Sequence, residues 1–192
     1  ALHICFKLAG VEENDEVLCP SLTFVATANA IAYQRAIPHF IDINSRTLGV
    51  CPEKLEHYLE KIVEHKQGVS WNKQTGRRIP ALVGVHAFGH PFDLDGIKKV
   101  CERFNIILIE DSAESLGTLY KGKHTGNWGA VSAMSFNGNK IITTGGGGAI
   151  LTQDESLAKL ARHLTTTAKI PHPWRLDHDV MGYNYRLPNI NA

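Results

Sequence analysis

The sequence predicts an α/β fold with three αβα layers, in which a mostly parallel sheet is covered by helices on both faces. Short apolar runs alternate along the chain with longer segments that carry apolar residues at helical spacing. Such alternation is typical of parallel sheets, because each crossover between strands places a helix on one face. Hydrophobic residues make up 43% of the 192 residues and charged residues 20%, which is enough for a substantial core.

The first half of the chain contains two expected strands and three expected helical segments. In chain order they are the end of a helix at 1–8, a strand at 16–19, a helix at 23–35, a strand at 37–41 and a surface helix at 53–66. Pro52 marks the start of the surface helix, because proline fits the first helical turn. The polar segment 67–78 contains glycine, so we expect an exposed loop there.

The second half shows the alternation more clearly. The expected strands cover 81–85, 106–109, 131–136 and 148–152, and the expected helices cover 93–104 and 154–164. Asp93 and Asp154 stand at the starts of the two helices, where an aspartate side chain can cap free backbone N–H groups. Periodicity ends after Leu164. We therefore expect a large domain at 1–164 and an exit segment at 165–192 that leads towards a C-terminal small domain.

Charge and cysteine usage narrow the class of protein. Twenty Lys and Arg against nineteen Asp and Glu give a net charge of +1. This balance argues against nucleic-acid and anionic-membrane binding, since both need clustered positive charge. No apolar run approaches the 18–20 residues or so of a membrane span. The four cysteines are widely spaced and form no C-x-x-C pair, so we expect buried free thiols in a cytoplasmic protein.

Ten histidines raise the question of a metal site. His86 and His90 have the i, i+4 spacing that places two ligands on one face of a helix. Gly89 and Pro91 break a helix at this point, so the spacing does not bring the two rings together. We therefore expect no metal site.

Three side chains stand where ligands bind in α/β proteins, at the carboxyl ends of strands. Asp111 follows the strand at 106–109, Ser135 ends the next one, and Lys140 lies five residues beyond Ser135. Asp111 and Lys140 also have ordinary structural interpretations, as a turn cap and as an exposed loop lysine. The glycines at 145–148 can likewise be a flexible turn. The glycines are not a P-loop, because no Gly-Lys-Ser/Thr follows them.

Taken together, the three side chains suggest one chemistry. A lysine amine can form a Schiff base with an aldehyde cofactor. A carboxylate can hold a protonated pyridine nitrogen, which makes the ring an electron sink. A hydroxyl can contribute to a phosphate cradle. These are the parts of a site for pyridoxal 5'-phosphate.

The segments that carry these residues resemble the DegT/DnrJ/EryC1/StrS family of sugar aminotransferases, which are pyridoxal phosphate enzymes of fold type I. The similar segments follow the family's order over essentially the whole chain, at 1–11, 15–31, 38–43, 109–118, 121–129, 135–149 and 182–192. The resemblance implies that Lys140 is the Schiff-base lysine and that Asp111 pairs with the pyridine nitrogen. It also implies that Ser135 contacts the phosphate and that Phe24 stacks on the ring.

Two further residues have roles by resemblance. Glu114 occupies a position near the ring where relatives often carry Gln or His. Asn184 is expected to reach the cofactor phosphate of a neighbouring subunit, which implies a homodimer with a shared site. The alternatives are core packing for Phe24 and a turn or cap for Asn184.

The family resemblance implies transfer of an amino group from an amino acid, with glutamate expected, to a keto sugar nucleotide. The expected products are 4-amino-4,6-dideoxy sugars for bacterial surface glycans, including legionaminic-acid-type sugars. One alternative is a pyridoxal phosphate sugar dehydratase, but such relatives carry His in place of the lysine. A non-catalytic protein that keeps the fold is another.

The chain begins and ends inside motifs, so we expect a cut at both ends. The family's phosphate cradle before residue 1 and its small domain would then be missing. A lower cofactor affinity than that of a longer protein would follow.

Overall fold

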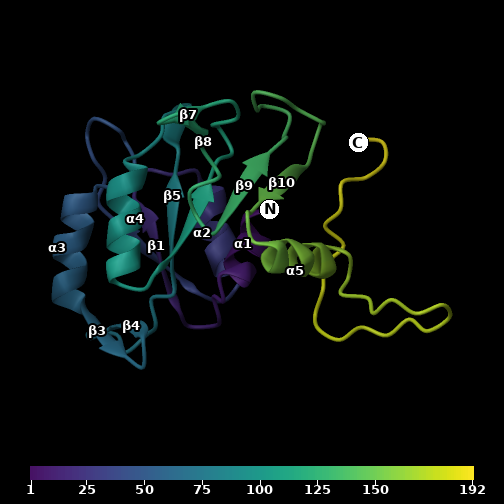
Figure 1. Cartoon of the computed structure of the whole chain (residues 1–192), viewed down its shortest axis with the longest axis horizontal. Helices are drawn as coiled ribbons and strands as arrows, with labels where there is room; N and C mark the ends of the chain where they lie inside the picture. Colours follow the sequence, from purple (N-terminus) through teal and green to yellow (C-terminus); the bar gives the residue numbers. More distant parts are fainter.

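The computed structural model describes residues 1–192 and contains a six-stranded sheet in the order β10-β9-β6-β5-β1-β2 (Figure 1). Its strands are β1 Glu16–Pro20, β2 Ile37–Ile41, β5 Ala81–Val85, β6 Ile107–Asp111, β9 Val131–Ser135 and β10 Gly148–Leu151. All neighbouring pairs are parallel except β9 and β10. The predicted α/β class with a mostly parallel sheet is therefore confirmed.

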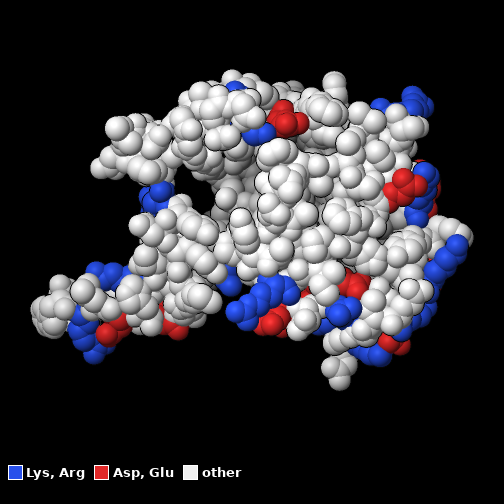
Figure 2. All heavy atoms as spheres, turned by 180° about the vertical axis from the view of Figure 1, so that it is seen from behind, with Lys and Arg blue, Asp and Glu red and all other residues white.

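The C-terminal segment 166–192 contains no helix and no strand of the sheet. Figure 1 shows it extending away from the body of the molecule beyond α5 (Glu155–Thr165). In the reverse view of Figure 2, acidic and basic side chains are intermixed at the edges, and a hollow opens between the extension and the body. The predicted end of the large domain at Leu164 lies one residue from the end of α5, and the role of 165–192 as an exit segment stays a prediction.

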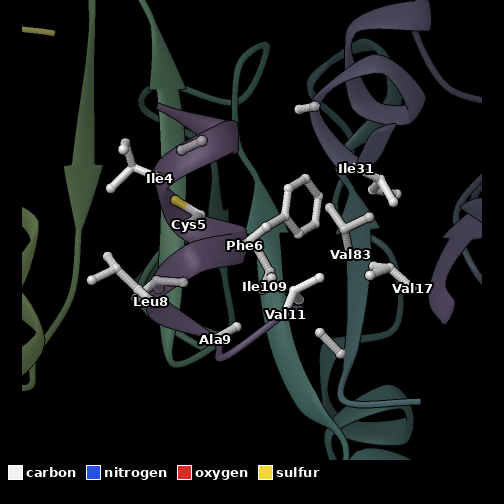
Figure 3. Packing of buried hydrophobic residues seen from close by; sticks show 14 of the residues in the cluster. Ile4, Cys5, Phe6, Leu8, Ala9, Val11, Val17, Ile31, Val83 and Ile109 are labelled. Carbon is white, nitrogen blue, oxygen red and sulfur yellow. The ribbon is translucent and has the colours of Figure 1, made fainter. Parts of the chain in front are cut away.

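The helices cover the two faces of the sheet in two groups. Helices α1 (Leu2–Leu8), α2 (Val25–Ala32) and α5 pack on one face, and α3 (Pro52–Ile62) and α4 (Leu94–Arg103) pack on the other. Successive strand residues point to opposite faces, so each central strand supplies both cores. Val17, Val83 and Ile109 join the core around α1 (Figure 3), while Leu18, Leu82 and Leu108 join the core around α3 and α4.

The structure corrects the prediction for residues 53–78. The surface helix ends at Ile62 rather than Lys66, and Val63–Lys66 forms strand β3, which pairs antiparallel with β4 (Val69–Asn72). Gln67 and Gly68 both have positive φ, which suits the two-residue turn of a tight hairpin. The segment is not simply an exposed loop, because Ser70 and Asn72 are buried.

Smaller differences concern element boundaries and short extra strands. The predicted helix at 23–35 is shortened to α2, and β6 extends two residues beyond the predicted strand, as far as Asp111. A two-stranded sheet of β7 (Leu119–Tyr120) and β8 (Lys123–His124) lies in a region without a predicted element. A single turn of 3₁₀ helix, η1 (Ala87–Gly89), follows β5.

The prediction of buried free thiols is confirmed, since all four cysteines are free and buried. Burial raises the pKa of Cys5, Cys19 and Cys101 to about 12, so these thiols stay protonated and behave as small apolar core residues. None of the helices is both long enough and apolar enough to cross a bilayer.

Gly84 in β5 is needed for the packing of Phe92, a fully buried ring of the core around α3 and α4. A Cβ atom at Gly84 would lie 2.3 Å from Cζ and 2.6 Å from Cε1 of Phe92. We predict that Gly84→Ala lowers the free energy of unfolding by about 1–3 kcal/mol, because the ring has to move within a packed core. Urea denaturation measures the change.

Gly146→Ala is the matched control, because a Cβ there meets no atom within 4 Å. Its unfolding free energy should stay within about 0.5 kcal/mol of the parent value. Equal unfolding midpoints for Gly84→Ala and the parent protein would contradict the packing argument.

Candidate active site

A cavity of about 700 Å³ lies at the carboxyl edge of the parallel strands. This edge is where open α/β sheets bind ligands, and the volume suits a small molecule. Five of the six predicted site residues line it: Phe24, Asp111, Glu114, Ser135 and Lys140. Residues separated by more than a hundred positions in the sequence therefore meet around one space.

Asp111 lies at the end of β6 with its side chain buried against the cavity. Its Oδ1 atom accepts a hydrogen bond from the Ala113 N–H at 3.2 Å, and its Oδ2 atom accepts one from the Thr27 hydroxyl at 3.1 Å. The contact with Ala113 is the turn-capping role considered from the sequence. Burial raises the pKa of Asp111, an effect that these two hydrogen bonds and the charges of Lys140 and His86 oppose.

Lys140 follows β9 and places its amine in the same cavity. Only 16% of its side chain is exposed, so Lys140 is not a freely solvated loop lysine. Nζ lies 3.5 Å from Oε1 of Glu114, and Oε2 of Glu114 accepts a hydrogen bond from the Phe88 N–H at 3.0 Å. The Glu114 carboxylate is thus held in place beside the amine.

Ser135 lies at the end of a strand of the sheet, whereas Phe24 is an exposed ring on the surface beside the cavity. Ser135 ends β9, and its hydroxyl accepts a long hydrogen bond of 3.4 Å from the Asn137 N–H. Phe24 stands just before α2 and is 74% exposed, so the core-packing alternative for this ring is wrong. A large aromatic ring with most of its surface uncovered beside a cavity is available to stack on a ligand.

Asn184 is the one predicted residue that does not line the cavity. It is exposed, and its backbone forms an isolated bridge with Thr166. Its predicted role towards a neighbouring subunit stays a prediction.

Glu110 and His86 form a buried pair to which the sequence assigned no site role. Oε2 of Glu110 lies 3.0 Å from Nε2 of His86, and both side chains are fully buried. Glu110 also accepts backbone hydrogen bonds from Gly126, Trp128 and Gly129 at 2.7–2.8 Å. Burial alone would raise the pKa of Glu110, but the bonds from His86 and the backbone N–H groups outweigh it and hold this pKa below its ordinary value.

The Glu110 contacts hold together the segments that carry the site. His86 directly follows β5, Glu110 is next to Asp111 in β6, and the loop at 126–129 leads into β9. Period-two alternation along the strand could have identified Glu110, because it must point to the face opposite Asp111. No sequence signal indicates its partners. His86 pairs with this carboxylate rather than with His90, and no group of three or more potential metal ligands is present.

Comparison with protein families matches residues 1–192 to the DegT/DnrJ/EryC1/StrS aminotransferase family. The chain belongs to this family. The resemblance inferred from the ordered sequence segments is thereby confirmed. The family's cofactor is pyridoxal 5'-phosphate, in agreement with the cofactor predicted from Lys140, Asp111 and Ser135.

Curated relatives match the chain throughout. EpsN of Bacillus subtilis (strain 168), whose name describes a pyridoxal phosphate-dependent aminotransferase, is 42% identical over all of this chain and 47% of its own length. A GDP-perosamine synthase of Escherichia coli O157:H7 is 38% identical over all of this chain and 48% of its own length. The chain therefore spans about half the length of these relatives.

Solved structures share the fold. The aminotransferase TlmJ from Streptoalloteichus hindustanus superposes with a TM-score of 0.83 at 30% identity, covering 99% of this chain and 47% of that one. An aminotransferase from Psychrobacter cryohalolentis gives the same TM-score at 28% identity, with the same two coverages.

Glu110→Gln should destabilise the fold in a pH-dependent way. The amide removes the charge that four donors surround, so we expect a loss of about 3 kcal/mol at pH 7. Because the pKa of Glu110 is depressed in the folded protein, its stabilisation is present above the ordinary carboxyl pKa and is lost as the pH falls through the folded value. Urea denaturation at pH 7 and at pH values below about 4 measures both effects.

The exposed Glu102, whose side chain is 66% exposed, offers the control Glu102→Gln. This variant should unfold like the parent protein at every pH. A gap between Glu110→Gln and the parent protein that stays constant down to the lowest pH would show that Glu110 is not charged in the folded state.

Proposed function

We propose that the chain is the cofactor-binding part of an aminotransferase that moves an amino group from an amino acid to a keto sugar nucleotide. One observation carries the proposal: a largely buried lysine amine and a buried carboxylate line the same cavity at the carboxyl edge of the sheet. This combination suits an aldehyde cofactor with a protonatable ring nitrogen. Aminotransferase relatives that match the whole chain support it.

The residues of the cavity fit pyridoxal 5'-phosphate group by group. Lys140 offers an amine for the aldehyde. Asp111 forms no ion pair with a cation of the chain, so its carboxylate is available to the ring nitrogen. Ser135 offers a hydroxyl for the phosphate, and the exposed Phe24 offers a face for the ring. Glu114, held by the Phe88 N–H, is the remaining charged side chain beside the amine.

When bound, the cofactor supplies an electron sink for the charge that develops at the carbon carrying the amino group. The protein supplies the proton chemistry around it. Nζ of Lys140 takes a proton from that carbon and returns it to the neighbouring position as a general base and acid. Glu114 keeps this amine inside the cavity, and Asp111 favours the protonated ring nitrogen.

The substrates are proposed from the family and its named relatives. We propose glutamate as the amino donor and a 4-keto-6-deoxy sugar nucleotide as the acceptor, in line with the GDP-perosamine synthases among the relatives. The product would be an amino sugar for surface glycans. We also propose a homodimer in which Asn184 contacts the cofactor of the partner subunit, and its position outside the cavity of its own chain supports this. We propose a cytoplasmic location as well, which four free thiols support.

Lys140→Ala should abolish the visible absorption band that appears when pyridoxal 5'-phosphate is added, because Lys140 is the one lysine that lines the cavity. Amino transfer should fall by a factor of at least about 10³, since both covalent attachment and the general base are lost. Absorbance titration and borohydride trapping followed by peptide mass analysis measure attachment.

Lys159→Ala is the matched control, because the side chain of Lys159 is 75% exposed on α5. It should keep the band and the activity. A band that survives Lys140→Ala would overturn the assignment of Lys140 as the Schiff-base lysine. A product of the keto sugar nucleotide that has lost a hydroxyl group and gained no nitrogen would identify the reaction as dehydration rather than amino transfer.

A further inference from the structure

Two threonines link the start of α2 to Asp111. The Thr23 hydroxyl lies 2.8 Å from the Thr27 hydroxyl, which in turn lies 3.1 Å from Oδ2 of Asp111. Thr27 is fully buried in the first turn of α2, whereas Thr23 lines the cavity. Thr27 is separated from Asp111 by 84 positions in the chain, so the contact joins helix α2 to the end of β6.

The direction of the two hydrogen bonds follows from the chemistry of the groups. An ionised carboxylate only accepts hydrogen bonds, so the Thr27 hydroxyl must donate its proton to Oδ2. The Thr27 oxygen is then free to accept from Thr23, and the short Thr23–Thr27 distance fits that arrangement. Accepting one bond strengthens a hydroxyl as a donor in the other, so Thr23 reinforces the contact with Asp111.

We propose that Thr27, oriented by Thr23, is a positioning residue that holds Asp111 ionised and aimed at the ring nitrogen of the cofactor. The inference rests on the proposed function. Thr27 fixes Oδ2 and the Ala113 N–H fixes Oδ1, so the carboxylate cannot rotate and keeps its remaining acceptor sites for the cavity. The Thr27 hydroxyl is its one side-chain hydrogen-bond donor.

The electrostatic surroundings of Asp111 explain why the Thr27 hydroxyl affects its ionisation. Burial raises the pKa of Asp111, so the ionised form depends on the few groups that stabilise it. Besides Ala113 and Thr27, the charged or titratable groups that act on it are Lys140, His86, the Cys5 thiol and the amine of residue 1. Loss of the Thr27 hydroxyl should raise the pKa of Asp111 further and weaken its hold on a protonated nitrogen.

Thr27→Val and Thr27→Ser separate the hydroxyl from the packing, because valine matches the shape of threonine and serine keeps the donor. We expect Thr27→Val to raise the dissociation constant for pyridoxal 5'-phosphate about tenfold, the amount typical of a lost hydrogen bond to a charged group. Thr27→Ser should bind within about threefold of the parent protein. Absorbance titration measures both variants.

A cofactor analogue with CH in place of the ring nitrogen tests whether Thr27 affects cofactor binding through Asp111. It cannot pair with Asp111, so Thr27→Val should change its dissociation constant less than about twofold if Thr27 acts through that carboxylate. The pH at which the visible band of bound pyridoxal 5'-phosphate changes should also shift in Thr27→Val and not in Thr27→Ser. A purely structural role would weaken both ligands equally and leave the pH profile in place.

Equal losses for the two ligands, or no loss for either, would overturn the proposal. Should Thr27→Val fail to fold, Thr23→Val provides the second variant, since Thr23 is only partly buried. It should show the same selectivity with a two- to threefold effect, and equal effects on both ligands would again overturn the proposal. Failure of the proposed function looks different, because the band would then survive Lys140→Ala.

Discussion

The buried Glu110 carboxylate is the interaction on which the site depends. It lies in the interior and accepts hydrogen bonds from one imidazole and three backbone N–H groups. An unpaired charge in this position would be strongly destabilising, so folding must complete the whole set of donors. Completing it fixes the ends of β5 and β6, where His86 and Asp111 lie, and the loop that leads into β9, the strand that ends at Ser135.

The adjacent residues Glu110 and Asp111 of β6 have different roles: Glu110 stabilises the fold, and Asp111 faces the cavity. Glu110 and Asp111 point to opposite faces of the sheet because side chains alternate along a strand. Glu110 has donors enough to stay ionised without a ligand, whereas Asp111 has only two and keeps acceptor sites towards the cavity. The first carboxylate can therefore be satisfied by the protein alone, and the second is left able to bind a cation.

Much of the fold and half of the candidate site residues could be predicted from local patterns, whereas Phe24, Glu114 and Asn184 were predicted only from the family resemblance. Strand–helix alternation indicated the sheet, and the carboxyl ends of strands indicated Asp111, Ser135 and Lys140. The β3–β4 hairpin was missed because a charged helical pattern runs into it without a break and because its turn begins with Gln67, an uncommon residue at positive φ. Thr27 and the partners of Glu110 were missed because their contacts join distant segments, which periodicity cannot show.

The antiparallel pairing of β9 and β10 has a mechanical consequence. Lys140 lies on the connection between two neighbouring, hydrogen-bonded strands, so both ends of its loop are anchored to the same small piece of sheet. The entropy of closing this loop is offset by the pairing of the two strands. The amine proposed to carry the cofactor therefore lies on a loop that is tied to the sheet at both ends, whereas Asp111 lies on β6, which is paired with a strand on each side.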